Sequence, residues 1–252
     1  MISSEKIIPI LQSCDNYNGI RYNVLGIEKG AIMTVNEIIL ISIGVLAVVG
    51  SIIAAVLGYE KKRRQGLENF ARYQGFTFQE KAEPISKSGN IKLFSKGRMP
   101  KVKNLISGTR SGAQFQVFDY QYTEGGGQNS ATHRQTVGVA TLPGLELPHF
   151  YLAPENIFHK IGKKFGMQDI NFDHFPVFSD YYLLKGDDEN AVRKLFSPGV
   201  LEYLQGNKLK QILEGDGNRL VFYKLNKREK ADEMPEFFEK FSYLVSLFNK
   251  RR

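Results

Sequence analysis

The longest hydrophobic stretch of the chain runs from Ile38 to Gly58 and contains no ionisable side chain. As an α-helix it would rise about 30 Å, which is the thickness of the hydrocarbon core of a bilayer. A cleaved secretory signal has a shorter apolar core, and its cations precede that core. Here the cations of a KKRR motif follow the stretch. The pattern therefore predicts one transmembrane helix, over residues 37–59.

The charges on either side of this helix predict its orientation. Four cations at 61–64 follow it directly, whereas Lys29 is the only cation close before it. Cytoplasmic flanks carry the excess of Lys and Arg. We therefore expect a single-pass protein of the cell (inner) membrane, with residues 1–36 as a short extracytoplasmic tail and the C-terminal domain in the cytoplasm. Translation from Met33 is the alternative, and it would leave only a few residues outside.

The KKRR cations have two interpretations, and the sequence does not choose between them. They set the topology, or they also bind anionic lipid headgroups, at about 1 kcal/mol per cation near such a surface. The side chains concerned are Lys61, Lys62, Arg63 and Arg64. In either case the lipid bilayer is the first predicted partner.

Small residues recur along the apolar stretch at spacings of three and four, so they share one side of the predicted helix. They are Ala47, Gly50, Ser51, Ala54, Ala55 and Gly58. Such a face lets two helices approach closely in lipid. It predicts a helix–helix contact and a homodimer through the span; the other interpretation is that small residues are simply common in spans.

The remaining chain alternates between short strand and helix patterns. Residues 60–80 are a basic juxtamembrane segment with a short helix that Gly75 can end. Within the predicted cytoplasmic domain, residues 81–252, the first part (81–103) is predicted to be a connecting loop because Lys, Ser, Gly and Pro dominate it. Segments 113–123 and 132–142 each alternate hydrophobic with polar residues, and EGGGQNSA lies between them, so they predict a hairpin. A shift of this period near Asp119 suggests a bulge.

Further strands and helices complete the fold class. Strand patterns occupy 104–112, 148–152 and 179–186, and a second hairpin turns at the DGN within 209–225. Helices are expected from Pro154, over 187–196, after Pro198, and from Pro235 with an apolar stripe to Phe248. Antiparallel meanders and hairpins with flanking helices, a C-terminal amphipathic helix and no repeated βαβ unit predict an α+β domain.

Composition limits the chemistry. The net charge of +8 suits an anionic partner, although mild basicity also serves solubility. The single cysteine, Cys14, excludes an internal disulfide and any multi-cysteine metal site. Aromatic residues on the 113–123 strand could stack on nucleic-acid bases, but Asp119 and Glu124 beside them argue against nucleic acid as a partner.

Catalytic motifs are missing from the sequence. The glycine triplet 125–127 lacks the Gly-Lys-Ser/Thr ending of a phosphate loop, and neither G-x-S-x-G nor H-E-x-x-H occurs. A mixed site of His159, Asp169, Asp173 and His174 can be drawn for a metal or for acid–base work, but no spacing demands it. We therefore predict no catalytic residue, cofactor or metal ligand.

Four segments, KKRR, NLISGTRSG, VFDYQYT and LPHFYLAPE, resemble uncharacterised single-span bacterial membrane proteins. The resemblance implies a membrane anchor with a cytoplasmic domain and carries no known activity. The leading hypothesis is a membrane-anchored binding or scaffolding protein with an unknown ligand and an unknown protein partner. The alternative is a membrane-tethered enzyme with a cleft near His159, Asp173 and His174.

Overall fold

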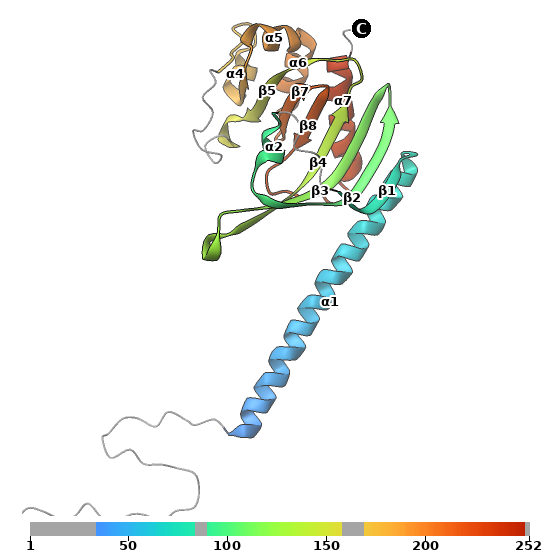
Figure 1. The fold of residues 1–252 in the computed structure, drawn as a ribbon, viewed down its shortest axis with the longest axis vertical. Coiled ribbons are helices and arrows are strands. Elements are labelled where there is room, and N and C mark those ends of the chain that lie inside the picture. The colour runs from blue at the N-terminus through green and yellow to red at the C-terminus, as the bar shows by residue number, and fades with distance from the viewer. Residues whose placement is uncertain (1–33, 84–89, 158–168, 250–252) are drawn as a thin grey trace, which may run out of the picture. The chain divides into compact units, whose positions relative to one another are not determined.

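The computed structural model describes residues 34–83, 90–157 and 169–249. The chain divides into two compact units, Met1–Ala55 and Val56–Arg252. Helix α1 (Val35–Tyr73) contributes residues to both units (Figure 1).

In the first unit, the described residues are Thr34 and the start of α1. Thr34 and Glu37 cap the helix reciprocally: the Glu37 amide donates to Thr34 Oγ1 (3.3 Å), and the Thr34 amide donates to Glu37 Oε2 (2.7 Å). Every side chain from Val35 to Ala55 is exposed, and the most apolar window of α1 has a mean hydropathy of 2.8. A helix that is apolar on all sides requires apolar surroundings. By length and composition, α1 is able to cross a membrane.

The second unit is built on one antiparallel sheet with flanking helices, which confirms the predicted α+β class. Its eight strands have the order β1-β2-β3-β4-β8-β7-β5-β6 (Figure 1). The strands are β1 (Thr77–Ala82), β2 (Arg98–Arg110), β3 (Ala113–Glu124), β4 (Ala131–Thr141), β5 (Leu147–Pro154), β6 (Tyr182–Gly186), β7 (Ile212–Gly217) and β8 (Arg219–Tyr223). The helices after α1 are α2 (Lys92–Ser95), the 3₁₀ helix η1 (Gly127–Asn129), α4 (Pro176–Tyr181), α5 (Glu189–Leu195), α6 (Pro198–Asn207) and α7 (Met234–Asn249).

Both predicted hairpins are present. Strands β3 and β4 pair without interruption from Gln114↔Thr141 to Glu124↔Ala131, and η1 forms the tip. Strands β7 and β8 turn at Gly217, whose φ of +58° is a conformation that glycine adopts without strain. The turn residues of the sequence therefore position both hairpins.

The larger core joins α7 to the sheet and to the domain part of α1. Phe238 of α7 lies edge-on to Phe70 of α1 and to Phe115 of β3, with ring centroids 5.9 and 5.3 Å apart. Aromatic pairs of this geometry contribute about 0.5–1.5 kcal/mol beyond their burial. The predicted stripe of α7 is buried throughout: Phe237, Phe238, Phe241, Leu244, Val245 and Phe248. Helix α1 is thus fixed to the domain through α7.

Strand β3 contributes its residues alternately to the larger core and to a second, smaller core. Phe115 and Val117 belong to the larger core, whereas Phe118 and Tyr120 belong to the smaller one, where Phe94 of α2 packs edge-on to Tyr120. Because successive side chains of a strand point to opposite faces, α2 lies across the sheet from α7.

A buried carboxylate ties α2 to the sheet. Glu214 of β7 is fully buried and accepts hydrogen bonds from the amides of Lys92 (2.6 Å) and Leu93 (3.3 Å). The Tyr223 hydroxyl of β8 donates a third, at 2.7 Å. Burial raises the pKa of Glu214, and these hydrogen bonds oppose the rise only in part.

Three sequence predictions about element boundaries were wrong. The pattern at 179–186 forms a strand only from Tyr182, because Pro176–Tyr181 form α4. Strand β2 begins at Arg98, inside the predicted loop 81–103. Its exposed residues 101 and 103 alternate with the buried Val102 and Asn104, as expected for a strand. Pro154 ends β5 opposite Tyr182 instead of starting a helix. Helical structure follows at residues 155–157, and the rest of that predicted helix, with His159, lies outside the described residues.

Candidate functional site

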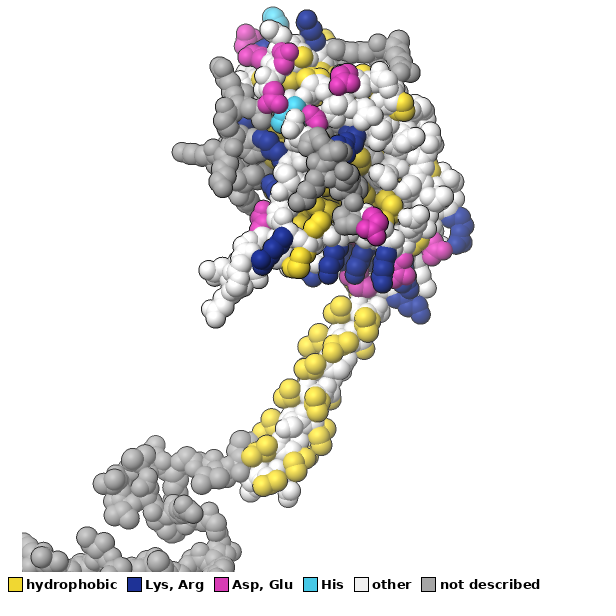
Figure 2. All heavy atoms as spheres, in the orientation of Figure 1, with side chains coloured by type: hydrophobic (Ala, Val, Ile, Leu, Met, Phe, Trp, Pro, Cys, Tyr) yellow, Lys and Arg dark blue, Asp and Glu magenta, His cyan; other side chains and the backbone are white. Residues whose placement is uncertain are grey.

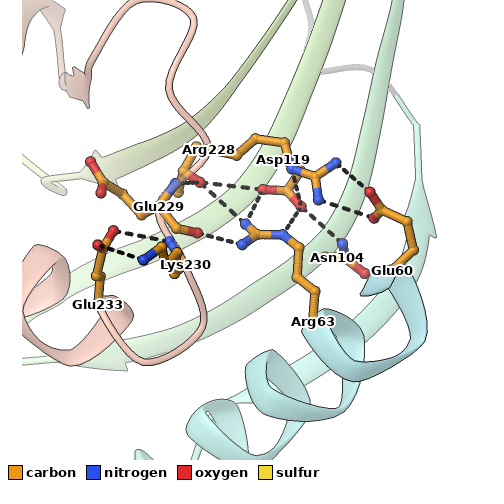
Figure 3. Close-up of polar contacts among 9 residues, drawn as sticks. Glu60, Arg63, Asn104, Asp119, Arg228, Glu229, Lys230 and Glu233 are labelled. Carbon is orange, nitrogen blue, oxygen red and sulfur yellow. Dashed lines mark hydrogen bonds and ion pairs between the residues drawn. The ribbon is translucent and has the colours of Figure 1, made fainter. Parts of the chain in front are cut away.

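Arg63 of α1 and Asp119 of β3 form a buried ion pair in the domain (Figure 3). Arg63 is 4% exposed and Asp119 is 8% exposed. Two hydrogen bonds join them, from Arg63 Nε to Asp119 Oδ2 (3.0 Å) and from Nη2 to Oδ1 (2.6 Å). A two-point geometry of this kind is the strongest that a guanidinium and a carboxylate form.

The remaining hydrogen-bonding groups of this pair are also satisfied. Asn104 Nδ2 donates to Asp119 Oδ2 (2.9 Å), and Thr136 Oγ1 lies 3.3 Å from Oδ1. Arg63 Nη1 donates to the backbone carbonyl of Glu229, which precedes α7. Buried charges are tolerated when they are paired and fully hydrogen-bonded, so this network connects α1 to β2, β3, β4 and the segment before α7.

A β-bulge in β2 places Asn104 in the network. Lys103 pairs with Asp119 and Ile106 pairs with Val117, so two β2 residues stand opposite Phe118. Asn104 has a φ of +53°, a left-handed conformation that asparagine tolerates better than most residues. The bulge is therefore in the strand opposite Asp119, whereas β3 itself pairs regularly with β4 at that point. The shift of period in the sequence marks the buried charge of Asp119 and not a bulge in its own strand.

A second ion pair lies beside the first. Both oxygens of Glu60, on α1, accept from Arg228, at 2.9 and 3.0 Å (Figure 3). Arg228 Nε is also 3.9 Å from Asp119 Oδ2. Glu60 and Arg63, about one turn apart on α1, thus join the helix to β3 and to the loop before α7 through ion pairs.

Three members of these ion pairs, Glu60, Asp119 and Arg228, line a groove of about 550 Å³. One wall is α1, with the apolar Val56 and Leu57 followed by Lys61 and Arg64. Strands β1–β4 form the floor, which is lined by Lys81, Lys101, Lys103, Gln121 and Arg134. Figure 2 shows Lys and Arg side chains gathered in a row on this part of the domain. We call this feature the basic groove.

Strand register brings the floor residues together in two rows. Lys81 of β1 is opposite Lys103 of β2, which in turn is opposite Asp119. In the next row, Lys101 is opposite Gln121, which is opposite Arg134. Opposed side chains on a sheet are about 5 Å apart at Cβ, so the lysines of one row are close neighbours.

The acidic residues of the groove are already paired. Glu60 is bound by Arg228, Glu80 lies 2.6 Å from Arg64, and Asp119 is bound by Arg63. Within the described parts of the chain, no ion pair involves the four groove lysines at 61, 81, 101 and 103. The groove therefore presents positive charge that no neighbouring carboxylate neutralises.

The structure separates the four KKRR cations, which the sequence analysis treated alike. Lys61 and Arg64 line the basic groove, and Lys62 is exposed outside it. Arg63 is buried against Asp119, so its guanidinium does not reach lipid headgroups in the folded domain, contrary to the expectation for that residue. The headgroup role stays a prediction for the other three.

The small residues of the span all lie on α1 and are exposed. Ser51 donates its hydroxyl to the Ala47 carbonyl one turn back (2.8 Å), and a Cβ added at Gly50 or Gly58 would meet no atom within 4 Å in the described structure. The face is therefore open along its length, and the homodimer it predicts stays a prediction.

The residues proposed for an enzymatic cleft are not assembled by the described structure. Asp173 and His174 are exposed, and Asp169 lies 3.0 Å from Lys185. His159 lies outside the described residues. Among the residues that the structure describes, no group of three His, Cys, Asp or Glu side chains is placed to hold a metal ion.

Sequence reasoning missed most of the groove, because its residues come from distant segments. Lys101, Lys103 and Arg134 converge only through strand pairing, and Arg228 joins them from the loop before α7. One signal was present: Asp119 interrupts an otherwise hydrophobic strand pattern, and a carboxylate at such a position requires a cationic partner.

These features define a class of protein: an α+β domain attached to a helix that is able to span a bilayer, with a basic groove that starts where the apolar stretch ends. No protein-family model matches the chain, and neither does any curated protein sequence. A solved structure does share the fold. It is the crystal structure of the mycobacterial trehalose monomycolate transport factor A, TtfA, with a TM-score of 0.52 and 13% sequence identity, covering 74% of this chain and 94% of that chain. At this identity the similarity establishes the fold alone.

Proposed function

We propose that this protein is a membrane-anchored accessory protein that binds an anionic ligand in the basic groove. One observation supports the proposal most directly: four lysines without an ion-pair partner in the described structure line a groove of about 550 Å³. Pockets for small ligands typically measure about 300–1,000 Å³. The volume is therefore suited to a small molecule or to one part of a larger one.

The arrangement of the lysines supports a ligand and not mere solubility. Lys81 and Lys103 are directly opposed in neighbouring strands, and like charges in that position destabilise a sheet. An anion between them would relieve the repulsion. A concave surface with one sign of charge also concentrates counter-ions from solution.

The location of the groove supports a ligand at the membrane surface. Val56 and Leu57 belong to the apolar stretch and also line the groove. We place the domain in the cytoplasm at the inner membrane, because cations follow the apolar stretch and few precede it. The similarity to TtfA, a mycobacterial transport factor, is consistent with an accessory role and does not name a ligand for this chain.

Scaffolding through the span is the second part of the proposal. The open face of small residues on α1 supports a homodimer, which would place two basic grooves in one assembly. A protein partner on the domain fits the same role. The enzymatic alternative has no comparable support, since Asp173 and His174 stand exposed without an acid or metal cluster in the described regions.

A titration of the full-length protein in a neutral detergent tests the proposal. The probe is inorganic pyrophosphate, and the readout is the midpoint of thermal unfolding, which rises when a ligand binds the folded state alone. We expect a rise for the wild type and none for Lys101→Gln/Lys103→Gln. The matched control is Lys194→Gln/Lys210→Gln, which removes two exposed lysines outside the groove. Equal responses of all three proteins would refute the proposal.

A further inference from the structure

We infer that the ligand of the basic groove is the phosphate-bearing headgroup of an anionic bilayer lipid. This inference rests on the proposed function and gives its ligand a chemical class. It also moves the predicted lipid contact away from the KKRR motif alone, to a site built jointly by α1 and the sheet.

Along α1 the lining of the groove changes from apolar to cationic, which matches the acyl chain and the charged headgroup of a lipid. Val56 and Leu57 are 54% and 64% exposed, and they form the part of the wall that continues the apolar stretch. Lys61 and Arg64 follow one and two turns later on the same helix. An acyl chain suits the first pair, and a phosphate suits the second.

The depth of these residues matches a headgroup layer. If the hydrocarbon core ends at Gly58, Lys61 lies about 4.5 Å and Arg64 about 9 Å further along the helix, at about 1.5 Å per residue. The polar layer on one side of a bilayer is about 5–8 Å thick. Both cations therefore fall at the level of the phosphates or at their outer border.

The sheet supplies further cations, so positive charge lines the groove on two sides and not along the helix alone. Lys81, Lys101 and Lys103 come from β1 and β2, and they face the same groove as Lys61. The ion pair between Arg63 and Asp119 holds α1 against β3, so the helix wall and the strand floor keep a fixed spacing. A single phosphate group can thus contact cations from two sides, which a linear KKRR motif does not offer.

Lipid selectivity of the full-length protein tests the inference. Purified protein in neutral detergent is titrated with phosphatidylglycerol or with phosphatidylcholine, and native mass spectrometry counts the lipids bound per chain. We expect saturation at one phosphatidylglycerol per chain and no saturable phosphatidylcholine. Lys101→Gln/Lys103→Gln should weaken phosphatidylglycerol binding roughly thirtyfold, from about fivefold per lysine near an anionic surface. The control Lys194→Gln/Lys210→Gln should change it less than about threefold.

The other outcomes overturn the inference in distinguishable ways. Equal weakening in the two double variants would mean diffuse attraction to charge, and it would overturn a groove-bound lipid. Pyrophosphate binding that depends on Lys101 and Lys103, together with no preference for phosphatidylglycerol, would overturn the lipid inference and leave the proposed function standing. Loss of both responses would overturn both. Thermal unfolding of each variant without ligand confirms that the comparison is made between folded proteins.

Discussion

Arg63 and Asp119 are 56 positions apart in the sequence, and their side chains meet inside the domain in a two-point ion pair of 2.6 and 3.0 Å. Asn104, Thr136 and the Glu229 carbonyl complete the hydrogen bonding around them. The pair therefore joins the domain part of α1 to β3, beside the basic groove that Asp119 helps to line.

Asp119→Ala should be the most damaging single substitution near the groove. It leaves the buried guanidinium of Arg63 without a counter-charge, and the loss of one partner of such a pair costs about 3–5 kcal/mol of unfolding free energy. Denaturant unfolding of the full-length protein in mild detergent measures the change. The control is Glu80→Ala, which removes the exposed partner of Arg64 and should cost less than about 1 kcal/mol. Similar losses in both variants would contradict the structural role assigned to Asp119.

Glu214 should make stability depend on pH. Burial raises its pKa above the ordinary value of 4.5, so the folded state holds this proton more tightly than the unfolded state does. The resulting stabilisation is fully present below the unfolded pKa and is lost as pH rises through the folded pKa. Relative to Glu214→Gln, the wild type should therefore lose unfolding free energy as pH increases from about 4.5 upward.

Urea unfolding of both proteins across that pH range provides the measurement. At about pH 4.5 and below, Glu214→Gln should be less stable than the wild type by about 1–3 kcal/mol, because an amide nitrogen would face the backbone N–H of Lys92 or Leu93. This difference should shrink as the pH rises. A difference between the two proteins that does not vary with pH would mean that Glu214 titrates normally in the fold.

Gly50→Leu/Ala54→Leu should abolish dimers in the membrane. Leucine at these positions fills the open face and keeps a second helix at a distance. Crosslinking in native membranes, followed by electrophoresis, reports the dimer. The control is Val49→Leu/Ile53→Leu, which puts two leucines at the same spacing on α1, outside the face of small residues. Unchanged crosslinking in the first variant, or equal loss in both, would rule out this face as the contact.

Gly138→Ala should destabilise the domain by about 1–3 kcal/mol, the usual cost of overpacking a core. A Cβ at this position of β4 would lie 2.7 Å from Phe241 of α7, so the helix would have to move. Gly199→Ala is the control: in α6 a Cβ meets no atom within 4 Å in the described structure, and alanine favours a helix. Thermal unfolding of the two variants should shift in opposite directions or, for the control, not at all.

Local patterns in the sequence were sufficient for the elements that depend on neighbouring residues. The apolar stretch, the helix end at Gly75 (φ +70°), the helix within 187–196 and the stripe of α7 were all visible as periodicities or as residues typical of helix ends. Each of these is decided within a few positions by hydrogen bonding or by one buried face. The α+β class followed from their order.

The groove could not be predicted in the same way, because the strand register decides which residues line it. Lys101 and Lys103 were predicted to be loop residues, since Lys, Ser, Gly and Pro dominate residues 81–103. Only pairing with β1 and β3 shows that they extend a strand and face α1. The burial of Arg63 was not predicted for a different reason. It lies in a run of four cations that look alike in the sequence, and its partner Asp119 is in a distant strand.

Burial of Arg63 also has a consequence for the order of events during synthesis. Asp119 follows Arg63 by 56 residues, so at about 5–20 residues per second it is made roughly 3–11 s later. If α1 is inserted as the sequence predicts, the guanidinium during that interval is an unpaired cation beside the nascent helix, where it would add to the charge that orients membrane helices. After folding, the same charge is paired inside the domain. In that topology one side chain would act first in insertion and later in the folded domain, at separate times.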